Sequence, residues 1–91
     1  MVSRRVRIEG LVQGVGYRAW TARTARALGL TGWVRNRRDG SVEAHFQGPA
    51  GKVAEMLLAC ETGPRSAEVE RIEVLSEACE MLADFEVRPT E

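Results

Sequence analysis

The chain has 91 residues, and its 13 Lys and Arg residues balance 13 Asp and Glu residues at a net charge of zero. We expect a single domain over residues 1–91, because domains typically run about 100–150 residues. The 44% apolar content excludes an intrinsically disordered chain. No apolar stretch approaches the roughly 18 residues of a membrane span, and no signal peptide is recognisable, so we expect a cytoplasmic protein.

Apolar periodicity divides the chain into short strands and two amphipathic helices. In chain order, the predicted elements are a strand at 4–12, a helix at 17–28, strands at 30–38 and 41–48, a helix at 50–61, a strand at 67–75 and a short strand at 84–88. Asp39-Gly40 lies between two of the strands and favours a type I′ hairpin. His45 alternates with polar neighbours on the face opposite Phe46, so we expect an exposed histidine.

This order of elements predicts an α+β fold, the ferredoxin-like α/β sandwich (βαββαβ plus a short fifth strand). In that fold an antiparallel sheet carries two helices on one face. Right-handed crossovers then place the first four strands in the order 4-1-3-2.

The charge is distributed unevenly along the chain. Residues 1–38 hold nine arginines and one acid, whereas residues 39–91 hold four basic groups and twelve acids. Either the first half faces an anion, or the two blocks form ion pairs across strands.

Two isolated cysteines, Cys60 and Cys79, form neither a disulfide framework nor a zinc quartet, so we expect free thiols, with Cys60 acting as a small hydrophobe on a helix.

The turn at residues 13–18 (Gln-Gly-Val-Gly-Tyr-Arg) is the most informative segment. A helix N-terminus presents unpaired N–H groups and the positive end of the helix dipole, and glycines before it let the backbone curl into an anion-sized nest. Arg18 adds a guanidinium group that matches phosphate or carboxylate oxygens. A tight strand–helix turn with Arg18 in solvent is the alternative.

Two familiar phosphate motifs do not account for this turn. No Gly-Lys-Ser/Thr follows it, so it is not a P-loop. Residues 14–19 match the dinucleotide pattern G-x-G-x-x-A, but the next strand turns back in a hairpin and the chain is too short for further parallel units.

Asn36 lies on the core-facing side of its strand with Val34 and needs partners, so it is either a structural residue of the hairpin or holds a ligand or a water.

Two segments together resemble the signatures of the acylphosphatase family, namely residues 12–18 (VQGVGYR) and 28–43 (LGLTGWVRNRRDGSVE). Gln47-Gly48, Gly63-Pro64, Ala67 and Val69 extend the resemblance over nearly the whole chain. The resemblance implies the ferredoxin-like fold and hydrolysis of the carboxyl–phosphate bond of acyl phosphates, with no metal and no cofactor.

The resemblance also implies roles for particular residues. The implied phosphate-binding residues are Gln13, Gly14, Val15, Gly16, Tyr17 and Arg18. Arg18 matches the essential catalytic arginine of the family, and Asn36 matches its water-positioning asparagine. Tyr17 stands where the family often has Phe, a small departure that keeps the aromatic packing.

The implied partner is a small-molecule acyl phosphate, and we expect neither a nucleic-acid nor a membrane partner. We expect a monomer, because no apolar stripe stands out on the predicted surface. The arginines suggest a ferredoxin-like RNA-binding module as an alternative, but such sheets stack bases on aromatic side chains, and aromatic residues make up only 5% of this chain. A second alternative is an anion-binding domain of acylphosphatase type without catalysis.

Overall fold

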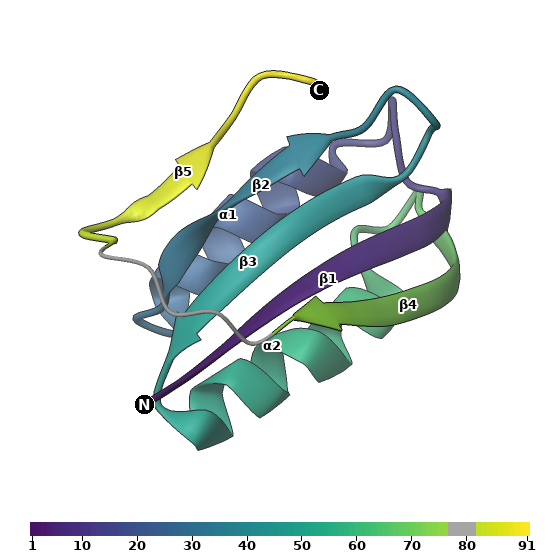
Figure 1. Ribbon diagram of the computed structural model, residues 1–91. Helices are drawn as coiled ribbons and strands as arrows, with labels where there is room; N and C mark the ends of the chain where they lie inside the picture. The colour runs from purple at the N-terminus through teal and green to yellow at the C-terminus, as the bar shows by residue number, and fades with distance from the viewer. Residues whose placement is uncertain (77–81) are drawn as a thin grey trace.

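The computed structural model describes residues 1–76 and 82–91, which form one five-stranded sheet with two helices packed on the same face (Figure 1). The elements are β1 (Val2–Leu11), α1 (Tyr17–Ala27), β2 (Thr31–Asn36), β3 (Val42–Gly48), α2 (Ala50–Thr62), β4 (Glu68–Ser76) and β5 (Phe85–Val87). The strand order β4-β1-β3-β2-β5 confirms the predicted 4-1-3-2 arrangement of the first four strands, which pair antiparallel. The short β5 joins the edge of the sheet in parallel with β2.

The core lies between the sheet and the two helices. Its completely buried apolar side chains are Val6, Ile8, Ala25, Val34, Val42, Ala44, Phe46, Met56 and Cys60. Burial raises the pKa of the Cys60 thiol to about 12, so this cysteine stays neutral and packs as a small hydrophobe, as predicted. Cys79, the other predicted free thiol, lies outside the described residues.

The face of the sheet opposite the helices is covered by long side chains. The prediction that His45 is exposed was wrong, because only 1% of its surface is accessible. It lies on the central strand β3 between Arg5 of β1 and Trp33 of β2, whose ring centroid is 6.0 Å from the imidazole. The alternating pattern assigns His45 to the outer face correctly, but it carries no information on what covers that face.

The two charge blocks of the sequence meet on this outer face. Glu43, which is 5% exposed, accepts contacts from the guanidinium groups of Arg35 at 2.8 Å and Arg37 at 3.1 Å. Arg7 lies 3.3 Å from the Glu73 carboxylate on the neighbouring strand β4. Pairing across strands therefore accounts for these arginines, and they need no external anion.

The hairpin between β2 and β3 differs from the predicted type I′ turn. That turn requires positive φ at both central residues, whereas no described residue other than glycine has positive φ. The N–H of Gly40 donates to the Arg37 carbonyl at 3.1 Å, and Gly40 alone takes a φ of 95°. Asp39 accepts from the Ser41 N–H at 2.9 Å and from its hydroxyl at 2.6 Å, which lowers the pKa of the Asp39 carboxyl. The loop is thus one residue longer than predicted, with glycine last.

Candidate functional site

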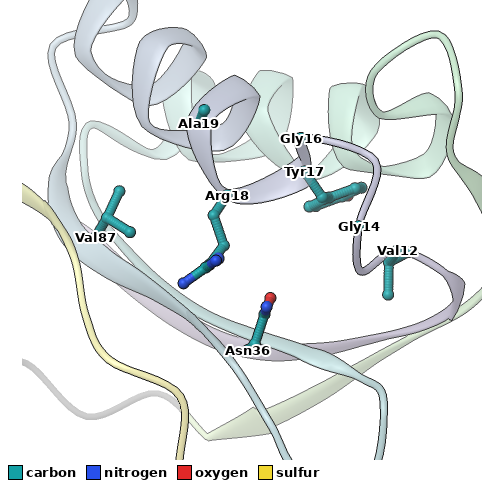
Figure 2. A pocket seen from close by; sticks show the side chains of 8 residues that line it. All are labelled: Val12, Gly14, Gly16, Tyr17, Arg18, Ala19, Asn36 and Val87. Carbon is teal, nitrogen blue, oxygen red and sulfur yellow. The ribbon is translucent and has the colours of Figure 1, made fainter.

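A pocket of about 310 Å³ lies between the start of α1 and the ends of β2 and β5 (Figure 2). It is lined by Val12, Gly14, Gly16, Tyr17, Arg18, Ala19, Asn36 and Val87. The pocket thus brings together the glycine turn, Arg18 and Asn36, which the sequence singled out separately.

The backbone of the turn is shaped by its two glycines. Gly14 has a φ of 73° and Gly16 a φ of 77°, a left-handed conformation that residues with a Cβ resist. A Cβ at either position would meet no atom within 4 Å, so the backbone conformation, not the available space, favours glycine.

This conformation leaves a run of backbone N–H groups without acceptors. The first helical hydrogen bond of α1 runs from the Trp20 N–H to the Gly16 carbonyl at 3.0 Å, and no side chain caps the helix. Within the described residues, the N–H groups from Gly14 to Ala19 donate no hydrogen bond. Together with the positive end of the α1 dipole, they form a nest suited to an anion.

Two polar side chains extend into this pocket. Arg18 comes from the first turn of α1 and Asn36 from the last residue of β2, and Figure 2 shows the guanidinium and the amide directed into the same space. Both residues are half-buried, and neither side chain makes a hydrogen bond or an ion pair with any described residue. Arg18 therefore contrasts with the paired arginines of the sheet face, and its charge is available to a ligand.

Gln13 connects the glycine turn to the β2–β3 hairpin. Its amide nitrogen Nε2 donates to the carbonyl oxygens of Arg37 at 2.7 Å and Ser41 at 2.8 Å. Its side chain does not line the pocket. The side chain thus fixes the turn against the segment that directly follows Asn36.

The side chains of Val15 and Tyr17 anchor the turn from the core side. Val15 packs against the core cluster, and Tyr17, which is 1% exposed, donates its hydroxyl to the Cys60 carbonyl at 2.7 Å. Burial raises the pKa of Tyr17 well above its ordinary value, so the phenol stays protonated and keeps this hydrogen bond. The Tyr17 hydroxyl, absent from phenylalanine, therefore satisfies a carbonyl near the C-terminus of α2.

The wall of the pocket opposite the turn was not predicted from the sequence. Backbone hydrogen bonds hold residues 88–91 along β2: the N–H of Arg88 donates to Val34 at 2.8 Å, and the N–H of Glu91 donates to the carbonyl of Asn36 at 3.0 Å. The Glu91 carboxylate also lies 2.6 Å from the Arg35 guanidinium. This pairing brings Val87 into the pocket and supports the strand end that carries Asn36, but no local motif marks it.

Metal-binding clusters and membrane-spanning helices are absent from residues 1–76 and 82–91. No cluster of three His, Cys, Asp or Glu side chains suited to a metal ion occurs among these residues. Neither helix in this part of the chain has the length and apolar content needed to cross a bilayer.

A ferredoxin-like sandwich whose pocket contains an arginine and N–H groups without acceptors among the described residues is an α+β protein with a pocket suited to an anion. The acylphosphatase family model matches residues 4–87. A relative from Rhodospirillum rubrum named acylphosphatase is 53% identical over 85 residues, which cover 93% of each chain. The chain belongs to the acylphosphatase family.

Solved structures agree with this assignment. The crystal structure of acylphosphatase from Bacillus subtilis superimposes with a TM-score of 0.92 at 34% identity, covering 97% of this chain and 99% of that one. A structure of full-length HypF, in a phosphate- and nucleotide-bound form, shares the fold at a TM-score of 0.88 and 23% identity. The match covers 98% of this chain but 12% of HypF, so the same fold also occurs within a much longer protein.

Proposed function

We propose that this chain is a metal-independent acylphosphatase in which residues 13–18 bind the phosphoryl group and Asn36 positions the attacking water. Its family membership assigns it the hydrolysis of acyl phosphates to a carboxylate and inorganic phosphate. One observation supports the residue assignment. The N–H groups of the turn, the Arg18 guanidinium and the Asn36 amide, none of which has a hydrogen-bond partner among residues 1–76 and 82–91, converge on a single pocket.

The turn and Arg18 supply the charge stabilisation. The transition state of phosphoryl transfer is largely loose and spreads negative charge over the equatorial oxygens, so catalysis depends on positioning and electrostatics. Backbone N–H groups that are fixed before the substrate arrives stabilise this charge without reorganisation. Arg18 adds a planar guanidinium group that donates two parallel hydrogen bonds to phosphate oxygens. These groups take the part that a divalent cation plays in other phosphoryl-transfer enzymes.

Asn36 completes the reaction by holding a water in line with the bond that breaks. Its amide both accepts and donates hydrogen bonds, and orientation of a nucleophile lowers the barrier substantially. The water oxygen bonds to phosphorus while the acyl C–O–P linkage breaks at phosphorus, and the carboxylate leaves with the electron pair. Its conjugate acid has a pKa of about 4–5, so no general acid is needed.

The proton of the attacking water goes to a phosphoryl oxygen of the substrate. No carboxylate, imidazole or amine is found among the described residues that line the pocket. The titratable side chains among these described residues are Arg18 and Tyr17, and the Tyr17 hydroxyl is committed to the Cys60 carbonyl. A protein group whose titration controls the rate would contradict this step.

We further propose that residues 1–91 form one domain, which acts as a cytoplasmic monomer and does not bind nucleic acid. Supporting the first point, all the described strands share one sheet and the described helices pack on one core. Against an RNA-binding sheet, Phe46 is buried in the core and Trp33 is only 3% exposed, so neither offers a free ring for stacking bases. Light scattering at micromolar concentration tests the monomer.

The decisive experiment compares initial rates of benzoyl phosphate hydrolysis, with EDTA present, for the unmodified protein, Arg18→Gln and Asn36→Ala. Arg23→Gln is the matched control, because Arg23 is exposed on the same helix and does not line the pocket. We expect rapid wild-type turnover, a loss of at least about 100-fold in both pocket variants and no change in the control, since removal of one preorganised donor costs about 10²–10³ in rate elsewhere. A folded Arg18→Gln enzyme with normal turnover would refute the assignment.

A further inference from the structure

The pocket is larger than a phosphoryl group requires. Its volume is about 310 Å³. A phosphoryl group with its few oxygens fills only part of this space. The remainder is available to the acyl group of the substrate.

The apolar side chains that line the pocket differ in what they offer to a ligand. Val12 and Tyr17 are each 1% exposed and belong to the hydrophobic core, so they have no free surface. Val87 is 47% exposed, and Ala19 on the first turn of α1 is also exposed. Figure 2 shows Val87 on one side of Arg18, with Val12 and Gly14 on the other. The accessible surface of Val87 therefore lies across Arg18 from the glycine turn.

The strand that carries Val87 is fixed on two sides. Val87 pairs with the fully buried Val34 in the parallel register of β5 and β2. The guanidinium of Arg26 on α1 donates to the Phe85 carbonyl at 2.7 Å, and the N–H of Arg88 donates to the Val34 carbonyl at 2.8 Å. Val87 is thus held in place by its neighbours while half of its own surface stays accessible.

We propose that Val87, together with Ala19, which lines the same pocket, is the surface against which the acyl group of the substrate packs, and that the enzyme favours acyl phosphates with an uncharged, apolar acyl group. This inference rests on the proposed function, because it assumes that the phosphoryl group lies at the glycine turn. An acyl phosphate is charged at one end and apolar at the other, and the pocket has the same two-ended character. Packing the acyl group on Val87 removes apolar surface from water on both partners.

The test compares kcat/KM for benzoyl phosphate and acetyl phosphate in the full chain. Val87→Thr keeps the size and the β-branch of the side chain and replaces a methyl with a hydroxyl, so the strand is preserved. We expect the benzoyl-to-acetyl ratio of kcat/KM to fall about fivefold, mainly through KM for benzoyl phosphate, because a partly open wall contributes less than the 10–200-fold of an enclosed methylene pocket. Val87→Leu, which keeps an apolar wall, should retain the ratio.

Val74→Thr is the matched control, since Val74 is 54% exposed on β4 and does not line the pocket. Competitive inhibition by inorganic phosphate is the second readout, and it should be the same in Val87→Thr and the unmodified protein. An unchanged substrate ratio in Val87→Thr, or a changed inhibition constant for phosphate, would overturn the inference.

Arg18→Gln distinguishes a failure of the proposed function from a failure of the proposed acyl-binding surface. If it abolishes hydrolysis of both substrates while Val87→Thr leaves the ratio unchanged, the proposed function survives and the acyl-binding surface is wrong. If Arg18→Gln retains full activity, the proposed function itself fails.

Discussion

The pocket has two walls that are built in different ways. The first, residues 12–19, is a continuous segment whose shape follows from two glycines with positive φ and from the start of a helix. The second combines Asn36 and Val87, which are 51 positions apart in the sequence and meet because β5 pairs with β2. In the proposed mechanism, the local wall stabilises the charge of the phosphoryl group, whereas the assembled wall positions the water and the acyl group. Substitutions in the first wall should therefore have larger effects than those that weaken the supports of the second.

The largest effect is expected from Arg18→Lys. Lysine keeps the positive charge but loses the planar fork that donates two parallel hydrogen bonds to phosphate oxygens. We expect kcat/KM for benzoyl phosphate to fall about 100-fold, within the range for the loss of a preorganised donor. Arg23→Lys on the exposed side of the same helix serves as the control, and an equal loss there would show that the effect is structural.

A smaller effect is expected from Gly14→Ala. Alanine at a φ of 73° costs about 1–2 kcal/mol of backbone strain, since no neighbouring atom obstructs the new Cβ. Urea unfolding should show this decrease in the free energy of unfolding, together with a lower rate of hydrolysis because the N–H groups of the turn are displaced. Gly51→Ala in α2 is the matched control, which should stabilise by about 0.5–1 kcal/mol, because its φ is ordinary and the site is open. Equal stability changes in the two variants would show that the positive φ of Gly14 does not cause the loss.

A still smaller effect on activity is expected when a support of the second wall is removed. Glu91→Gln removes the charge that faces Arg35, but the backbone hydrogen bonds of residue 91 with Asn36 and Arg38 remain. Glu91 is well exposed, and such pairs contribute at most about 1 kcal/mol. We expect kcat to fall about two- to threefold at unchanged phosphate inhibition, measured at low and high salt. A 100-fold loss would mean that the tail contributes directly to the chemistry.

The smallest effect is expected from Asp39→Asn in the hairpin. Hydrogen bonds from Ser41 lower the pKa of Asp39 in the folded protein, so this carboxylate stabilises the fold above its unfolded pKa of about 3.9. That contribution disappears as the pH falls through the lowered folded pKa. Thermal unfolding should thus show a small deficit of the variant at pH 7 that vanishes in strong acid. A deficit that persists at all pH values would indicate a cause other than ionisation.

The sequence predicted the elements well and pointed to the turn and Arg18 as the charged half of the candidate site. Alternation and helical periodicity located both helices and the strands, and the glycine turn before Arg18 pointed to an anion nest because left-handed backbone and free N–H groups are local properties. It misjudged His45 and the type of hairpin, since the cover of a sheet face and the φ of Asp39 depend on neighbours. The assignment of Asn36 to water stays a proposal, although its position in the pocket beside Arg18 supports it.

By itself, the sequence determined what short stretches of chain prefer: which residues alternate, where a helix begins and where glycine allows a turn. Only the tertiary structure decided that the arginines of the sheet face are neutralised by acids while Arg18 is left without a described partner. It also decided that Val87 completes the pocket. The physical reason is that pairing between distant segments depends on which surfaces remain after the core has packed, and no local pattern encodes that outcome.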